Sequence, residues 1–296
     1  MVEYQENEML TNEFDSLDNI GWYPGHMAKA KRFIAANMSL VDMVVEIRDA
    51  RIPLSSANPN IKKLIGDKKH VVLLSKSTLA DMRVTDAWIN YFRSQGSECI
   101  AIDCKTLMGL DNFIKCVPNV MAERLEFYKR KGMNKPIRAM VLGVTNVGKS
   151  TFFNSLSRTK KAKVENRPGV TRTTQWVKTP YNLDLLDTPG LLWEKIDSKE
   201  TAFKLAVTGA IRDEVFNTIE VSWMLCKKLA ENYPELLKTR FKLDNIEGEG
   251  NEIFERIGRK RGFLLSGGVI DEERTAACLL DEFRKGKIGR ISLERP

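Results

Sequence analysis

Residues 138–151 read Arg-Ala-Met-Val-Leu-Gly-Val-Thr-Asn-Val-Gly-Lys-Ser-Thr. The apolar run at 140–142 is typical of a buried strand, and residues 151–156 are compatible with a helix. Between them lies the pattern Gly-x-x-x-x-Gly-Lys-Ser, in which two glycines allow a tight turn whose amide groups face an anion. A strand, a glycine-bounded turn and a helix start in this order predict a phosphate-binding loop.

Two side chains of this loop carry the expected chemistry. Lys149 would reach the outer phosphates of a nucleotide, and the Ser150 hydroxyl would be a ligand of Mg²⁺. The alternative is a glycine turn that has a lysine beside it by chance, and it leaves the strand and helix context unexplained. The stretch therefore predicts binding of a nucleoside triphosphate with Mg²⁺. The predicted nucleotide contacts also include Asn146, Val147, Gly148 and Thr151.

The composition is that of a globular protein, because 43% of the 296 residues are apolar and 29% are charged. No apolar run approaches the roughly 18 residues that a membrane span needs, and the N-terminus lacks a signal-peptide pattern. Five scattered cysteines and two histidines show neither metal-ligand spacing nor an even disulfide set. These features predict a cytoplasmic protein with reduced cysteines and no membrane span.

The charge is unevenly distributed along the chain. Residues 1–20 hold six acidic residues and no basic ones, so the formal net charge of +8 leaves +14 on the rest. Such an excess favours a polyanionic partner, with a merely basic surface as the alternative. Residues 1–19 have little apolar content and no periodicity, and they read as a disordered acidic tail.

Short apolar strands and helices alternate up to about residue 186. We expect strands at 41–47, 70–74, 98–102 and 183–186, a short strand through Trp176, and helices near 59–66, 82–94 and 110–129, the last interrupted around Pro118. This alternation implies an α/β fold with a doubly wound, mainly parallel sheet. Ligands of such folds bind at the carboxyl ends of the strands, which is where the motifs fall.

Beyond about residue 195 the strand signals stop. Helical patterns follow at 201–211, 214–229, 234–241, 252–260 and 271–285. Basic clusters stand at Arg259-Lys260-Arg261 and Arg284-Lys285-x-Lys287. We therefore expect an acidic tail at 1–19, an α/β domain at 20–195 and a helical, basic domain at 196–296.

A second phosphate motif, Asp187-Thr-Pro-Gly190, ends an apolar strand 37 residues after Ser150. An acid at this place can hold Mg²⁺ directly or through water, and the Gly190 amide can bond a γ-phosphate. Alone, the tetrapeptide is merely a good turn. Paired with the phosphate loop, it predicts a GTPase-like switch, with Thr171 of the polar loop 167–174 as the second hydroxyl for Mg²⁺ and γ-phosphate.

The element that reads the base stands in an unusual place. An Asn-Lys-x-Asp sequence normally follows these motifs, and nothing downstream of Gly190 resembles one. Upstream, Ser75-Lys76-Ser77-Thr78 follows one predicted strand and Asp103-Cys104-Lys105 follows the next. The parts of a GTPase are thus present in rotated order. Circular permutation is physically tolerable because chain ends can open at exposed loops.

The motif order resembles the circularly permuted GTPases of the ribosome biogenesis GTPase A family, over about residues 20–296. The resemblance rests on Trp22-Tyr-Pro-Gly-His-Met-Ala-Lys-Ala, Asp49-Ala-Arg-Ile-Pro, Arg167-Pro-Gly-Val-Thr and Ile257-Gly-Arg-Lys-Arg-Gly. It implies a cytoplasmic bacterial-type GTPase that converts GTP to GDP. It further implies binding to large ribosomal subunit precursors and ribosomal RNA late in assembly, partly through the basic helical domain. We expect a monomer.

The chain departs from the family where the base is read. The family aspartate accepts two hydrogen bonds from the edge of guanine, whereas Thr78 offers one neutral acceptor. Loss of such a charged contact costs about 1.5–3 kcal/mol, or roughly ten- to a hundred-fold in affinity. The alternatives are therefore an NTPase that accepts ATP and GTP, and a nucleotide-regulated RNA-binding protein outside ribosome assembly. Cys104 replaces the family's serine-type residue, and Thr145 replaces a proline.

Three residues bear on hydrolysis. Leu191 stands where Ras-like enzymes place a water-orienting glutamine, so hydrolysis should be slow alone and stimulated by the ribosomal particle. By resemblance, His26, expected in a loop before the first helix, is the candidate for orienting the water. Asn146 matches a residue that helps related GTPases to bind K⁺, which makes K⁺ dependence a hypothesis.

Overall fold

The computed structural model describes residues 24–296 apart from 159–163, 166–175, 191, 193–195 and 197; the side chains of residues 24–28 and 164–165 are also outside it. The predictions for the tail 1–19, for the loop 167–174 with Thr171 and for Leu191 lie outside the described residues. The chain divides into two compact units, one of Tyr23–Glu194 with Glu294–Pro296 and one of Lys195–Leu293. The last three residues, which the sequence places with the helical segment, group with the sheet.

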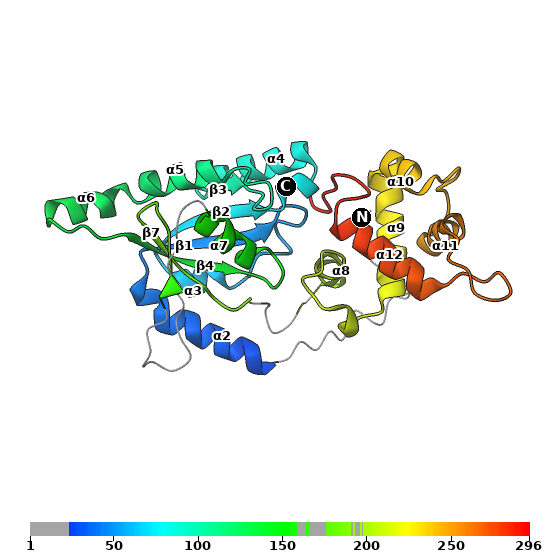
Figure 1. Ribbon diagram of the computed structural model, residues 1–296, viewed down its shortest axis with the longest axis horizontal. Coiled ribbons are helices and arrows are strands. Elements are labelled where there is room, and N and C mark those ends of the chain that lie inside the picture. The colour runs from blue at the N-terminus through cyan, green and yellow to red at the C-terminus, as the bar shows by residue number, and fades with distance from the viewer. Residues whose placement is uncertain (1–23, 159–163, 166–175, 191, 193–195, 197) are drawn as a thin grey trace, which may run out of the picture. The chain divides into compact units, whose positions relative to one another are not determined.

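The first unit is built on a seven-stranded sheet of order β3-β2-β1-β4-β7-β6-β5. Figure 1 labels β1, β2, β3, β4 and β7 of this sheet. Pairing is parallel from β3 through β7, while β6 runs antiparallel to β7 and β5, so the prediction of a mainly parallel sheet is confirmed. The sequence does not predict β5, which has only two residues. The strands are β1 (Met43–Asp49), β2 (Lys69–Ser75), β3 (Glu98–Ala101), β4 (Ile137–Gly143), β5 (Val164–Glu165), β6 (Trp176–Lys178) and β7 (Leu183–Leu186).

The helices of this unit differ from the expected ones in two places. The first helix begins at Pro24, so His26 lies in its first turn and not in a preceding loop; proline suits this turn because its missing N–H would have no helical partner. Pro118 lies within a helix that ends two residues later, and the break falls at Met121. The helices are α2 (Pro24–Asn37), α3 (Ile61–Ile65), α4 (Met82–Ser94), α5 (Leu110–Val120), α6 (Ala122–Arg130) and α7 (Lys149–Arg158), with short 3-10 turns η2 (Met38–Leu40) and η3 (Ser77–Leu79).

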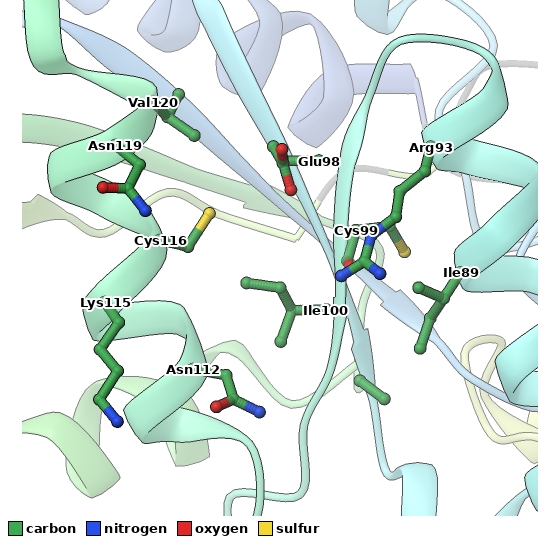
Figure 2. Close-up of a pocket in the computed structure, with 11 residues that line it drawn as sticks. Ile89, Arg93, Glu98, Cys99, Ile100, Asn112, Lys115, Cys116, Asn119 and Val120 are labelled. Carbon is green, nitrogen blue, oxygen red and sulfur yellow. The ribbon is translucent and has the colours of Figure 1, made fainter.

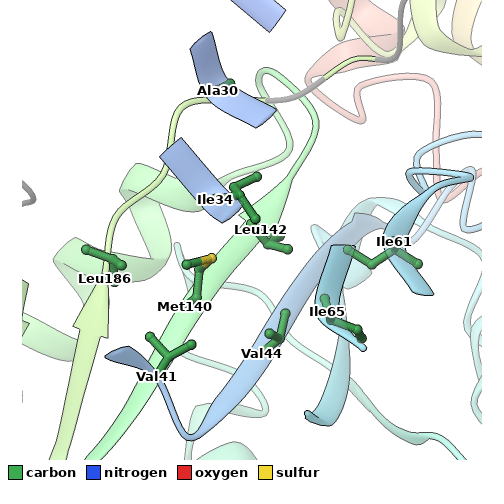
Figure 3. Packing of buried hydrophobic residues seen from close by; sticks show 9 residues of the cluster. All are labelled: Ala30, Ile34, Val41, Val44, Ile61, Ile65, Met140, Leu142 and Leu186. Carbon is green, nitrogen blue, oxygen red and sulfur yellow. The ribbon is translucent and has the colours of Figure 1, made fainter. Parts of the chain in front are cut away.

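One apolar cluster fixes the central strands against two helices. Val44 of β1 is in register with Met140 of β4, and paired residues of neighbouring strands point to the same face. Ile34 of α2 and Ile61 of α3 pack on that face together with Leu186 of β7, as Figure 3 shows. This burial holds β1, β4 and β7 in place, and the carboxyl ends of these strands carry the predicted motifs.

The C-terminus is anchored to the sheet unit. The Glu294 carboxylate accepts hydrogen bonds from the N–H groups of Leu54 (2.6 Å) and Ser55 (3.0 Å) and from the Ser55 hydroxyl. The buried indole N–H of Trp88 in α4 donates to the Glu294 carbonyl at 3.2 Å. These bonds explain why residues 294–296 group with the first unit.

The second unit is helical, as the sequence predicts. Its central helix α9 contacts α8, α10, α11 and α12, and Asp271 caps α12 by accepting a hydrogen bond from the N–H of Arg274. Among all residues that the structure describes, no helix is long and apolar enough to span a membrane. The helices are α8 (Lys199–Val207), the 3-10 turn η4 (Asp213–Val215), α9 (Thr218–Asn232), α10 (Pro234–Phe241), α11 (Gly250–Arg261) and α12 (Glu272–Arg284).

Candidate nucleotide-binding site

The predicted phosphate loop joins β4 directly to α7. Gly143 has a φ of +159°, and a Cβ atom there would lie 2.6 Å from the Ile47 carbonyl oxygen and 2.9 Å from Val147 Cγ1. Gly148 has a φ of +111° and Asn146 one of +55°. The turn therefore requires glycine at its first position. Lys149 follows the turn as the first residue of α7.

Lys149 is buried inside its own loop. Its ammonium donates hydrogen bonds to the carbonyl oxygens of Gly143 (2.9 Å) and Val144 (2.8 Å). Burial lowers the pKa of Lys149 to about 8, although the nearby Asp187 carboxylate opposes the shift. Burial raises the pKa of Asp187 in turn, against the opposing effects of Lys149 and of the Thr188 backbone. The two groups therefore form one electrostatic pair at the expected phosphate position.

The pKa of Lys149 predicts how nucleotide affinity depends on pH. Phosphates bind the protonated ammonium, and their charge raises its pKa in the complex, so affinity is near its maximum at pH 7 and falls as the pH rises through 8. We expect GDP to bind roughly tenfold more weakly at pH 9 than at pH 7. Calorimetric titrations across this range measure the change. In Lys149→Arg, whose cation does not titrate here, the residual dependence should be flatter; an equal pH dependence in both proteins would contradict the assignment.

The second motif lies directly against the phosphate loop. A Cβ atom on Gly190 would stand 2.9 Å from Thr145 Cγ2 and 3.0 Å from Thr145 Cα, so the two backbones approach as closely as glycine permits. The Thr188 hydroxyl fixes this position by donating to the Val141 carbonyl oxygen at 2.6 Å. The structure thus brings together two motifs that the sequence separates by 37 residues.

The donor atoms at this place suit magnesium. Ser150 is exposed at the start of α7, and Asp187 is half-buried beside Lys149. Mg²⁺ prefers oxygen ligands and is usually held by one or two protein groups together with phosphates and waters. Within the described residues, no group of three or more His, Cys, Asp or Glu side chains could hold a metal by itself. Ser150 and Asp187 therefore fit a cation that arrives with a nucleotide.

The predicted base-reading segments lie beside the phosphate loop, as the permuted order requires. The Ser75 hydroxyl donates to the Val147 carbonyl oxygen at 2.6 Å. The Ser77 N–H donates to the carbonyl oxygen of Ile102 at 3.2 Å, and the Thr78 hydroxyl donates to the Asp103 carboxylate. Segments 75–78 and 103–105 therefore meet each other at the carboxyl ends of β2 and β3, and the first of them touches the loop that follows β4.

Asp49, for which the sequence predicts no site role, contacts Lys76 of the first predicted base-reading segment. Its carboxylate accepts hydrogen bonds from Arg51 Nη2 (2.8 Å) and from Lys76 Nζ (2.9 Å). Burial alone would raise the pKa of Asp49, but the charges of Arg51 and Lys76 outweigh it and lower the pKa. Lys76, which has a left-handed φ of +54°, is held by this hydrogen bond to Asp49 within the predicted base-reading segment. The signal for this role was the Asp-Ala-Arg sequence at the end of a strand.

Cys104 and Lys105 complete the second predicted base-reading segment. Burial raises the pKa of the Cys104 thiol to about 11, although a hydrogen bond with Ser155 of α7 opposes the shift. The thiol is therefore neutral and contacts the helix that follows the phosphate loop. Lys105 is exposed. His26 lies in the first turn of α2, and its side chain is outside the described part of the chain.

A separate cavity of about 500 Å³ lies between α4, α5 and the edge strand β3 (Figure 2). Arg93 and Cys116 face it from the two helices, and Arg93 donates to the Cys99 carbonyl oxygen at 3.4 Å. Burial raises the pKa of Cys116 and raises that of Cys99 to about 12, so both thiols are neutral. None of the predicted nucleotide contacts lines this cavity, so the cavity is separate from the predicted nucleotide-binding site.

The fold and these contacts define a circularly permuted P-loop nucleotide-binding protein. A family model described as a 50S ribosome-binding GTPase matches residues 138–243. Ribosome biogenesis GTPase A of Priestia megaterium is 43% identical over 279 residues, which cover 94% of this chain and 97% of that protein. The protein of the same name from Thermotoga maritima is 34% identical, with 94% and 95% covered.

A solved structure shares the fold. The GDP-bound structure of TM YlqF matches with a TM-score of 0.65 at 29% identity, covering 90% of this chain and 99% of that one. The chain therefore belongs to the ribosome biogenesis GTPase A family, and it is a GTPase. This confirms the family, the fold class and the activity that the sequence predicts.

Proposed function

We propose that this GTPase acts in late assembly of the large ribosomal subunit, as a cytoplasmic monomer that binds precursor particles and ribosomal RNA. The nucleotide part of the proposal rests on one observation. Segments 75–78, 103–105, 143–151 and 187–190 lie together at the carboxyl ends of the parallel strands. The name shared by the relatives from Priestia megaterium and Thermotoga maritima, ribosome biogenesis GTPase A, supports the partner.

The nucleotide takes its position from these four segments. The base lies against Lys76 and Thr78, with Cys104 and Lys105 on its other side. The phosphates lie over the amides of residues 146–151, where Lys149 turns from its loop carbonyls to the phosphate oxygens. Ser150, Asp187 and the Thr171 hydroxyl would hold Mg²⁺, which would supply positive charge beside the phosphates.

Hydrolysis breaks the bond between the γ-phosphorus and the bridging oxygen as water attacks the phosphorus. The products are GDP and phosphate, and the proton of the water leaves with the phosphate. The Gly190 amide and the Lys149 ammonium stabilise the negative charge of the transferred group. Asn146, which has a left-handed φ of +55° within the phosphate loop, is proposed to be a residue that would hold K⁺.

His26 is proposed to orient the attacking water. General-base or water-positioning groups contribute typically 10²–10⁴-fold to rate. We expect His26→Ala to lower particle-stimulated turnover by about a hundredfold and to leave GDP and GTP affinity unchanged. Single-turnover hydrolysis and calorimetry measure the two quantities separately. An equal loss of nucleotide affinity would show that His26 binds and does not orient water.

The basic residues of the helical unit are of two kinds: some stabilise the unit through internal hydrogen bonds and ion pairs, and others are exposed and could bind RNA. Arg284 donates to the carbonyl oxygens of Ala206 and Val207 and pairs with Asp213, so it holds helices together. Arg261 is half-buried and pairs with Glu282 of α12 at 3.0 Å.

Lys260 and Lys285, by contrast, are exposed and make surface ion pairs with Asp244 and Asp281. Surface pairs are worth little, so phosphate groups can replace those acids. Lys260 and Lys285 are therefore the proposed RNA contacts.

Sedimentation with large-subunit precursor particles tests the proposed function. The full chain is incubated with particles and with a non-hydrolysable GTP analogue, GDP, the matching ATP analogue or no nucleotide. We expect stable binding with the GTP analogue only, and weaker binding as salt rises. The double variant Lys260→Ala/Lys285→Ala should bind less, while Lys115→Ala, an exposed lysine of the sheet unit, should match the native chain. Binding that ignores the nucleotide would contradict the proposal.

A further inference from the structure

This chain has Thr78 where the family motif has an aspartate, but a carboxylate from another loop lies beside that position. Asp103, from the neighbouring strand end, accepts a hydrogen bond from the Thr78 hydroxyl through Oδ2. Its other oxygen, Oδ1, accepts from the backbone N–H groups of Lys105 (2.8 Å) and Thr106 (3.2 Å). Asp103 is 4% exposed, whereas Thr78 is half-buried. The hydroxyl is therefore the outer member of the pair and the carboxylate the inner one.

The other nearby acids are committed elsewhere. Asp81 caps α4 by accepting from the N–H groups of Arg83 (2.9 Å) and Val84 (3.4 Å). Asp49 is bound by Arg51 and Lys76. Among the described acids of these loops, only Asp103 contacts the side chain that stands at the family's guanine-reading position.

This contact decides what Thr78 can offer a base. A free hydroxyl both donates and accepts, so it does not discriminate between a base edge that donates and one that accepts. The Thr78 hydrogen is directed to Asp103, which leaves only oxygen lone pairs toward the site, and donation to a carboxylate strengthens them as acceptors. Guanine presents two donors at that edge, N1–H and the 2-amino group, while adenine presents the N1 acceptor.

We propose that Thr78 and Asp103 form the guanine-selecting pair of this protein, with Thr78 touching the base and Asp103 acting through it as a positioning residue. This inference rests on the proposed nucleotide position. The protein should therefore select guanine and not accept ATP and GTP alike, because the Thr78 hydroxyl, a neutral acceptor, donates its hydrogen to the charged Asp103 carboxylate. The function of the missing aspartate is thereby divided between two strand ends.

The variant Asp103→Asn separates this role from a structural one. The N–H groups of Lys105 and Thr106 hold an oxygen at the Oδ1 position, so the amide nitrogen of asparagine must face Thr78 and donate to it. The Thr78 hydrogen then turns to the base. Xanthine has a carbonyl where guanine has its 2-amino group, and it suits the reversed hydroxyl.

Calorimetric titration of the full chain with GDP, XDP and ADP at pH 7 provides the test. We expect the native chain to prefer GDP, and Asp103→Asn to bind GDP roughly ten- to a hundred-fold more weakly while its XDP affinity rises. Thr78→Val should lose the GDP preference without gaining XDP. The double variant Thr78→Asp/Asp103→Ser, which places a carboxylate at position 78, should restore the preference for GDP.

Two results would overturn the pair: an unchanged ratio of GDP, XDP and ADP affinities in Asp103→Asn, or equal binding of GDP and ADP by the native chain. A uniform loss for all three nucleotides in Asp103→Asn would also overturn it, because that pattern signifies a role in loop structure alone. Failure of the native chain to bind any of the three would refute the proposed function itself.

Discussion

Lys149→Ala should lose at least a hundredfold in affinity for GDP and GTP and should keep its fold. The ammonium is the one side-chain cation buried in the phosphate loop among the residues described there, and its hydrogen bonds to phosphate are charge-assisted. Two such bonds contribute about 3 kcal/mol or more, which corresponds to a factor above roughly a hundred. Titration calorimetry with Mg²⁺ measures the loss.

The fold should tolerate the change because both hydrogen bonds of the Lys149 ammonium go to carbonyl oxygens of its own loop, and burying its charge is unfavourable in the free protein. We expect a thermal midpoint within a few degrees of the native one. Lys115→Ala, at an exposed lysine of α5, is the matched control and should bind as the native chain does. Native affinity in Lys149→Ala would mean that the phosphates bind elsewhere.

Gly143→Ala should both destabilise the sheet unit and abolish nucleotide binding. The added Cβ atom would stand 2.6 Å from the Ile47 carbonyl oxygen in β1, a backbone atom that cannot move without disturbing the pairing of β1 with β4. Overpacking of this kind costs about 1–3 kcal/mol, and relief of the clash must open the turn that aims the amides at the phosphates. Urea unfolding and GDP titration measure the two effects.

Gly66→Ala separates the clash from backbone strain. Gly66 also has a positive φ, +56°, but a Cβ atom there would meet nothing within 4 Å. It should lose about 1 kcal/mol of stability and no nucleotide affinity. If Gly143→Ala and Gly66→Ala had the same stability and the same GDP affinity, the close approach of the phosphate loop to β1 would not be needed for nucleotide binding.

The sequence predicts most of the elements because their ends carry local signals. Asp81 is a side-chain N-cap, and α4 begins at Met82 as expected. Alternating turns and apolar runs likewise define β7, whose bounds agree with the prediction. The first turn of α2 was misread because Pro24 and Gly25 resemble a loop, although proline is favoured at a helix start.

Contacts between distant residues are not encoded in such local signals. The bonds from Glu294 to Ser55 join residues 239 positions apart, and no periodicity reports them. The same holds for the site: both base-reading segments were found from motifs, but the Thr78–Asp103 bond depends on the register of β2 against β3. The sequence therefore predicts the permuted order of the motifs. It does not predict that residues of two loops share the recognition of guanine.

Hydrogen–deuterium exchange on addition of GDP and Mg²⁺ tests the central claim most directly. If one nucleotide bridges the early and late motifs, exchange should slow together in residues 75–78, 103–106 and 143–151, while α10 in the helical unit stays unchanged. Protection confined to 143–151, with 75–78 and 103–106 exchanging as in the free protein, would contradict the placement of the base between those two strand ends.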